Sequence, residues 1–220
     1  ASTSIVFLSE ESDADRQFQA MSRGGDDFLA KSLKSEHLVA AISGRARRFR
    51  SLRALMVRDS LTGLLNHTTT RQHLETEIAR AQREAAPLSF AIIDIDHFKA
   101  VNDTYGHAVG DRVIKSLARL LRQRLRATDV VGRLGGEEFG IALTGTPAAI
   151  AVDLFDKIRR EFSEIAFQAA DREFSVALSC GVADLPKDGD ATSLSDAADK
   201  ALYVAKADGR NRVVLAAADR

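Results

Sequence analysis

The sequence has little of several features that define particular classes of protein. Its 220 residues include one cysteine, Cys180, which excludes an internal disulfide framework and a zinc site built from several thiolates. No apolar run approaches the roughly 20 residues that span a bilayer, and no segment resembles a signal peptide. Net charge is also missing, because 31 Lys and Arg residues offset 31 Asp and Glu residues. We therefore expect a cytoplasmic protein that neither spans a membrane nor binds nucleic acid through a basic surface.

The chain does contain enough apolar material for a full domain core. Hydrophobic residues make up 45% of the sequence, which is too much for a disordered segment. A chain of 220 residues suits one domain with a smaller attachment. Because the sequence begins with Ala1 and not with Met, we expect it to be part of something longer.

Apolar periodicity predicts a mixture of strands and helices after residue 59. The run 88–95 (LSFAIIDI) is too apolar to alternate, which indicates a central strand covered on both faces. Further strands are predicted at 130–134, 139–144, 174–183 and 212–215, and helices at 68–83, 97–103, 110–126, 148–163 and 194–206. Strands and helices do not strictly alternate, so we expect an α/β (α+β) fold with one mixed sheet covered by helices.

A long helix is predicted over residues 35–58. One stripe of it repeats at intervals of four and three residues: Leu38, Ile42, Arg45, Phe49, Leu52 and Met56. This heptad stripe packs either on the chain's own next domain or on a second copy in a parallel coiled coil, and we favour the homodimer. An arginine cluster at 45–53 on the same helix is expected to be a solvated face, with phosphate binding as the alternative.

Two aspartates mark the end of the predicted central strand. A carboxylate at the end of an apolar strand is costly to bury unless a cation, hydrogen-bond donors or water compensate it. Asp96 has a structural explanation, since it is placed to cap the helix predicted from 97. Asp94 has none, and metal binding is its favoured interpretation.

A turn with two glycines and two glutamates connects two of the predicted strands. Gly135 and Gly136 lack Cβ atoms, so backbone N–H groups can closely approach an anion. Glu137 and Glu138 place like charges side by side where Asn-Gly or Asp-Gly would form a turn at lower cost. If the turn lies beside Asp94, the carboxylates can share divalent cations, and Mg²⁺ commonly combines one or two carboxylates with substrate phosphates. The pattern suits metal-dependent nucleotidyl transfer.

The GGEEF segment at 135–139 resembles the signature of GGDEF-domain diguanylate cyclases. Other parts of that family's pattern occur in order: DSLTGLLN at 59–66, DIDHFK at 94–99, ND at 102–103, GH at 106–107, GD at 110–111 and KADGRN at 206–211. The resemblance covers about residues 58–215. It implies a sheet like that of nucleotide cyclases and polymerase palms, and condensation of two GTP molecules to cyclic di-GMP and pyrophosphate. Each GTP would be held by one subunit of a homodimer.

The resemblance implies a role for each matching residue. Asp94, the backbone carbonyl of Ile95 and Glu137 would bind Mg²⁺, or Mn²⁺ in its place. Glu137 would also deprotonate the ribose 3′-hydroxyl, Glu138 would help bind metal or orient the site, and Lys99 would stabilise transition-state charge. The implied nucleotide-binding residues are Phe98, Asn102, His107, Asp111, Gly135, Gly136, Lys206 and Arg210. Among these, Asn102 and Asp111 would contact the guanine edge, and Lys206 and Arg210 the triphosphate.

Arg126 and Asp129 form an R-x-x-D pair shortly before the GGEEF segment. On its own such a pair is usually a surface ion pair. At this spacing the resemblance implies a site where the product, cyclic di-GMP, inhibits the enzyme. Lys157 or the arginine cluster at 45–53 would supply a further basic residue there.

Residues 1–34 resemble the C-terminal part of a response-regulator receiver domain. The run 5–9 (IVFLS) is similar to its fourth strand, and 24–31 (GGDDFLAK) to the run that ends in the receiver lysine. The expected organisation is therefore a partial receiver-like segment at 1–34, a dimerising linker helix at 35–58 and a cyclase domain at 59–220. The alternative function is a catalytically silent GGDEF-like module that binds GTP or cyclic di-GMP in signalling.

Overall fold

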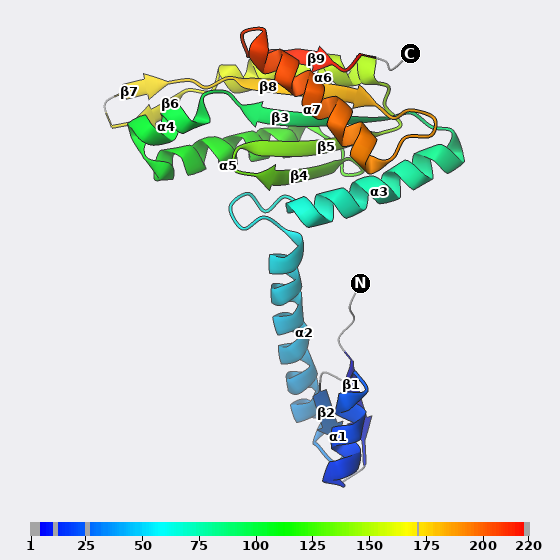
Figure 1. Ribbon diagram of the computed structural model, residues 1–220. Coiled ribbons are helices and arrows are strands. Elements are labelled where there is room, and N and C mark those ends of the chain that lie inside the picture. The colour runs from blue at the N-terminus through cyan, green and yellow to red at the C-terminus, as the bar shows by residue number, and fades with distance from the viewer. Residues whose placement is uncertain (1–4, 11–12, 25–26, 171, 218–220) are drawn as a thin grey trace. The chain divides into compact units, whose positions relative to one another are not determined.

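The computed structural model describes residues 5–10, 13–24, 27–170 and 172–217, with the side chains of residues 14 and 48–56 left out (Figure 1). The chain divides into two compact units, Ala1–Met56 and Val57–Arg220. Within the described residues, no helix is both long enough and apolar enough to cross a bilayer.

The first unit combines a strand–helix–strand segment with a long helix that ends where the second unit begins. Its elements are β1 (Val6–Ser9), α1 (Ala14–Ser22), β2 (Asp27–Ala30) and α2 (Ser35–Val57). The strands β1 and β2 pair in parallel. Arg45 on α2 donates a hydrogen bond to the carboxylate of Asp27 on β2, which packs the helix against the strand pair.

The heptad stripe of α2 is only partly within the described side chains. Leu38 is half-buried, Ile42 is 45% exposed, and Arg45 forms an ion pair with Asp27. Phe49, Leu52 and Met56 lie outside the described side chains. Pairing of the stripe with a second copy therefore stays a prediction.

The second unit is built on one mixed five-stranded sheet, which confirms the predicted fold class. The strand order is β4-β5-β3-β8-β9 (Figure 1). These strands are β3 (Leu88–Ile95), β4 (Val130–Gly135), β5 (Glu138–Thr144), β8 (Leu178–Asp184) and β9 (Val213–Leu215). The central strand β3 is antiparallel to β5 and β8, and all eight of its residues are buried. A strand with both faces covered has no polar face, which explains why its sequence is mostly apolar and does not alternate.

Helices cover both faces of this sheet. They are α3 (His67–Glu84), α4 (Phe98–Tyr105), α5 (His107–Arg124), α6 (Ala148–Ser163) and α7 (Ala191–Ala207). Ile93 of β3 packs with the apolar sides of α5 and α6, and Ile92 packs with those of α3 and α7. Cys180 lies in the core on the α5 and α6 side, where burial raises the pKa of its thiol and keeps it unreactive.

Close packing of α7 on the sheet depends on Gly181 of β8. A Cβ atom at this position would lie 2.1 Å from the carbonyl oxygen of Ala198 and 2.2 Å from the backbone nitrogen of Leu202. The helix backbone therefore rests directly on the strand, which fixes the C-terminal end of α7 over the sheet.

The prediction of one strand over 174–183 is wrong. A separate hairpin, β6 (Phe167–Ala169) and β7 (Arg172–Phe174), precedes β8, which begins only at Leu178. Phe174 stacks on Tyr105 with ring centroids 4.2 Å apart, and it also packs on Phe167. Phe174 and Val176 thus pack on the edge of the main core, and neither belongs to a strand of the central sheet.

Candidate active site

Strand pairing brings Asp94 and the GGEEF turn together. Asp94 lies opposite Glu138 of β5 and opposite Ser179 of β8 in the antiparallel register. Gly135 pairs with Glu138 across a bulge, so the turn closes directly beside the end of β3. Glu137 and Glu138 are both half-buried. The adjacency on which the predicted cation site depends is therefore present.

The electrostatics of this cluster are dominated by negative charge. Asp94 is 7% exposed, and its Oδ2 lies 2.8 Å from Nζ of Lys206 at the end of α7. Burial raises the pKa of Asp94, and Glu137 and Glu138 raise it further, while Lys206 only partly opposes them. Three carboxylates thus face one ammonium group, and an additional cation would relieve their repulsion.

The donor set suits a hard cation that brings its own further ligands. Carboxylate and carbonyl oxygens are the ligands that Mg²⁺ prefers, and Mg²⁺ usually completes its shell with water and substrate phosphates. In the part of the chain that the structure describes, no group of three or more His, Cys, Asp or Glu residues is arranged to hold a metal alone. Asp94, Glu137 and the carbonyl of Ile95 fit such a partial set.

A second group of predicted residues lies on α4 and α5. Phe98 is buried and Asn102 is half-buried on α4, whereas His107 and Asp111 are exposed on the first turns of α5. Gly110 separates the two helices at their closest approach: a Cβ atom there would lie 2.0 Å from Oδ1 of Asn102. The missing side chain at 110 therefore leaves the space in which the Asn102 carboxamide sits.

The predicted helix cap at Asp96 is wrong. The residue that precedes α4 is His97, which has a left-handed backbone (φ 56°) and makes no side-chain capping hydrogen bond. Asp96 instead accepts a hydrogen bond from the Ser179 hydroxyl (2.7 Å) and another from the backbone N–H of Asn211 (2.9 Å). Asp96 therefore contacts the loop that follows α7, where Arg210 is exposed.

Residues 56–212 match the family model described as "Diguanylate cyclase, GGDEF domain". The chain belongs to this family. The Pseudomonas aeruginosa protein named diguanylate cyclase DgcP is 38% identical over 158 residues, covering 72% of this chain and 24% of DgcP. The Caulobacter vibrioides protein named response regulator PleD is 35% identical over 228 residues, covering 97% of this chain and 50% of PleD. The chain thus spans half or less of the length of these curated relatives.

Solved structures of GGDEF domains share the fold. The active GGEEF domain of a Vibrio cholerae diguanylate cyclase is 37% identical, with a TM-score of 0.67 over 71% of this chain and 99% of that one. The coiled coil and GGDEF domain of DgcB from Caulobacter crescentus, solved with c-di-GMP, is 29% identical, with a TM-score of 0.75 over 82% of this chain and 98% of that one.

Arg133 is a residue of this GGDEF domain whose role the sequence analysis missed. Its guanidinium donates from Nε (2.9 Å) and from NH2 (2.7 Å) to the carbonyl of Gly136, and its NH1 lies 3.0 Å from Oδ2 of Asp59. Asp59 Oδ1 also accepts hydrogen bonds from the backbone N–H and the hydroxyl of Thr62. Burial alone would raise the pKa of Asp59, but the bonds from Thr62 and Arg133 lower it overall. An arginine two residues before the glycine pair was the available signal.

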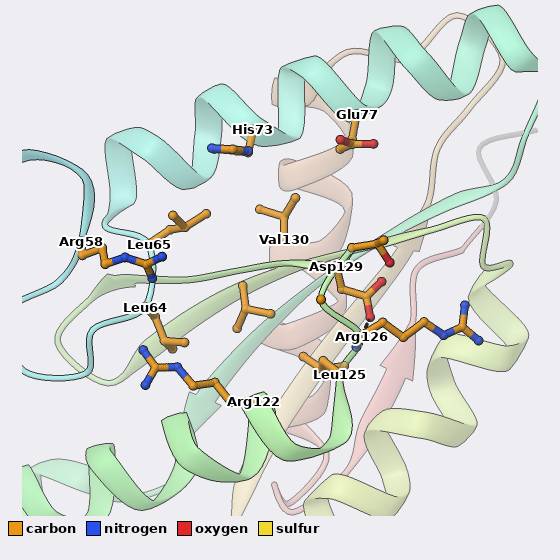
Figure 2. A pocket seen from close by; sticks show the side chains of 13 residues that line it. Arg58, Leu64, Leu65, His73, Glu77, Arg122, Leu125, Arg126, Asp129 and Val130 are labelled. Atoms are coloured by element: carbon orange, nitrogen blue, oxygen red, sulfur yellow. Dashed lines mark hydrogen bonds between the residues drawn. The ribbon is translucent and has the colours of Figure 1, made fainter. Parts of the chain in front are cut away.

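The R-x-x-D pair of the GGDEF domain lies where α5 ends, between two cavities. One cavity of about 600 Å³ is lined by residues of α3, α5 and the segment 125–131, and Figure 2 shows Arg58 and Arg122 at the opposite end of it from Asp129. The other, of about 400 Å³, is lined by Arg126, Asp129 and Lys157. Two of the basic residues named from the sequence therefore share one cavity.

The carboxylate of Asp129 is held in place by the backbone of Arg126, three residues earlier. Its Oδ2 accepts a hydrogen bond from the backbone N–H of Arg126 (2.8 Å). Its Oδ1 is buried and has no full hydrogen bond within the described residues; the backbone N–H of Thr144 adds only a weak interaction with the carboxylate. Burial raises the pKa of Asp129 and outweighs these contacts.

Proposed function

We propose that the second unit is a diguanylate cyclase, which condenses two GTP molecules into cyclic di-GMP and two pyrophosphates. The observation that carries this proposal is the placement of Asp94 beside the GGEEF turn with Lys206 against it. The relatives named diguanylate cyclases support it. Asp94, the Ile95 carbonyl and Glu137 would hold Mg²⁺ or Mn²⁺, which when bound lowers the cost of ionising a hydroxyl and of releasing pyrophosphate.

The chain's own residues divide the remaining work. Glu137 accepts the proton of the ribose 3′-hydroxyl, and Glu138, its neighbour on the turn, orients the site. Lys99, Lys206 and Arg210 bind the triphosphate, which competes with Asp94 for Lys206. Guanine lies between α4 and α5, where Asp111 and Asn102 contact its edge, Phe98 and His107 contact the nucleoside, and the backbone at Gly135 and Gly136 faces phosphate.

The proposed reaction needs two copies of the chain, because one site holds only one of the two GTP molecules. The heptad stripe of α2 is the proposed dimer contact, and exposed Ile42 supports it.

The first unit is proposed to be the end of a receiver domain. The alignment with PleD, which covers 97% of the chain, supports this. Cyclic di-GMP is proposed to inhibit the enzyme by binding at Arg126 and Asp129. The proposed location of the protein is the cytoplasm, where GTP is available.

Incubation with GTP and Mg²⁺ tests the activity directly. We expect cyclic di-GMP and pyrophosphate, resolved by ion-pair chromatography, and no product when the metal is removed by EDTA. A dimeric sample that binds GTP but yields no product would instead support the silent binding module.

Gly110→Ala tests the guanine site. The added methyl group would displace the Asn102 carboxamide, because it would lie 2.0 Å from its oxygen. We expect the KM for GTP to rise about tenfold, the cost of about one hydrogen bond. Gly44→Ala is the matched control, since a Cβ atom there meets nothing within 4 Å, and it should leave the KM unchanged. An unaltered KM in Gly110→Ala would contradict the role of Asn102.

A further inference from the structure

We propose that Asp96 is a positioning residue that holds the Arg210 loop in place against the strand that carries Asp94. The loop is the segment 208–211, which follows α7. This inference rests on the proposed function, because it assigns the held loop to triphosphate binding. Asp96 is not among the residues proposed to bind the metal ion or the nucleotide.

Asp96 is the common acceptor of two segments that are far apart in the sequence. Its side chain is buried, with the residue 4% exposed. One oxygen accepts from the Ser179 hydroxyl of β8 (2.7 Å), and the other accepts from the backbone N–H of Asn211 (2.9 Å). The backbone N–H of Asp96 donates to the carbonyl of Ala177 (3.0 Å). The carboxylate therefore joins the end of β3, the strand β8 and the loop at one buried point.

The loop needs such an anchor because of its backbone conformation. Gly209, Arg210 and Asn211 have φ angles of 104°, 61° and 47° in succession. Two consecutive residues with side chains in the left-handed region are unfavourable on their own and persist only where the surroundings fix them. The bond from the Asn211 N–H to Asp96 supplies one restraint, and the bond from the Arg210 N–H to the Ala205 carbonyl (3.0 Å) supplies a second.

A third restraint comes from α6. Arg159 donates from NH1 to Oδ1 of Asn211 (2.7 Å) and is itself held by Asp156 (2.8 Å). Asn211 is thus held through its backbone N–H by Asp96 and through its side chain by Arg159. Arg210, between Asn211 and the end of α7, can then present its guanidinium from a fixed backbone.

The hydrogen bond from the Asn211 N–H to Asp96 is also expected to persist when substrate binds. A second polar contact between this region and β3, beside the apolar packing of α7 on the strand, is the ion pair of Lys206 with Asp94. Both partners of that pair are needed by the proposed reaction, Asp94 for the metal ion and Lys206 for phosphate, so it is exchanged when substrate binds. Asp96 and Asn211 have neither task. Their bond can keep Arg210 at a constant position relative to Asp94 in free and occupied sites.

The test compares triphosphate binding with nucleoside binding. Asp96→Ala should weaken binding of a GTP analogue with a non-cleavable α–β bridge about tenfold, as expected for loss of one charge-assisted contact. It should change guanosine affinity by less than about twofold. Asp96→Asn can accept from Asn211 with its oxygen and donate to Ser179, so it should retain near wild-type affinity. Equal losses for both ligands, or no rescue by Asn, would overturn the proposal.

A double-mutant cycle identifies Arg210 as the residue through which Asp96 acts. If that is correct, Asp96→Ala should cost less than about twofold in an Arg210→Ala background, because the contact is already gone. Additive losses would overturn the proposal. These binding measurements need no turnover. A wild-type protein that makes no cyclic di-GMP would contradict the proposed function, whereas normal activity with additive losses would contradict only the role of Asp96.

Hydrogen exchange of the wild-type protein gives a test that does not depend on a variant that folds. Asn211 is an exposed residue, yet its N–H is bonded to a buried carboxylate. Its amide should exchange at least about tenfold more slowly than the same amide in an unstructured peptide. Exchange at the peptide rate would overturn the proposal.

Discussion

Replacing Asp94 by asparagine is expected to abolish cyclic di-GMP formation, with a fall in the initial rate of about a thousandfold. The amide has nearly the same volume but carries no charge, so it binds the metal ion poorly and releases Lys206 from its ion pair. Initial rates with GTP and Mg²⁺ measure the effect. Asp199→Asn is the matched control, because Asp199 is exposed on α7, and it should keep wild-type rates. A variant of Asp94 with more than a tenth of wild-type activity would contradict its role.

The same substitution should not destabilise the metal-free protein. Burial, Glu137 and Glu138 raise the pKa of Asp94 in the folded state above its unfolded value. The stability contributed by its protonated form is present below the unfolded pKa and is lost as the pH rises through the folded pKa. At neutral pH the charge of Asp94 therefore costs stability, and Asp94→Asn should melt at the same or a higher temperature. A clear decrease in melting temperature would show that packing, and not charge, was lost.

Arg126→Ala is expected to relieve product inhibition. The inhibitory concentration of cyclic di-GMP should rise by at least about tenfold, because a guanidinium contact to phosphate or guanine is removed. The local turn should survive, since Asp129 accepts from the backbone N–H of Arg126 and not from its side chain. Inhibition curves measured at a fixed GTP concentration give the shift.

Two comparisons make this result specific. Initial turnover in the absence of product should be unchanged, because Arg126 lies outside the GGEEF cluster. Arg119→Ala removes an exposed arginine from α5, the helix that ends just before Arg126, and should leave inhibition as it is in the wild type. Unchanged inhibition in Arg126→Ala would contradict a product site at this pair.

What the sequence predicted correctly depends on local pattern or on position along one strand pair. The strand 88–95 was predicted with its observed bounds because burial on both faces favours a mostly apolar run without alternation. The hairpin that carries GGEEF joins neighbouring strands, so the turn could be placed from the sequence alone. The role of Asp96 was missed because its partner, Asn211, is 115 residues away, and local capping was the nearest explanation. Arg133 was missed for a similar reason, since Asp59 is 74 residues distant.

The bonds of Arg133 also have a thermodynamic consequence. One guanidinium holds the carbonyl of Gly136 in the GGEEF turn and the carboxylate of Asp59, shortly after the residue where the second unit begins. Because one guanidinium bonds to both turns, fixing it on either turn lowers the entropy cost of its bond to the other. Order in either turn therefore favours order in the other. If a nucleotide binds at Gly136 as proposed, its effect on the order of the segment at Asp59 would equal the effect of that segment on nucleotide affinity. Changes at the beginning of the second unit would then alter nucleotide affinity by the same factor by which the nucleotide alters the order of that segment.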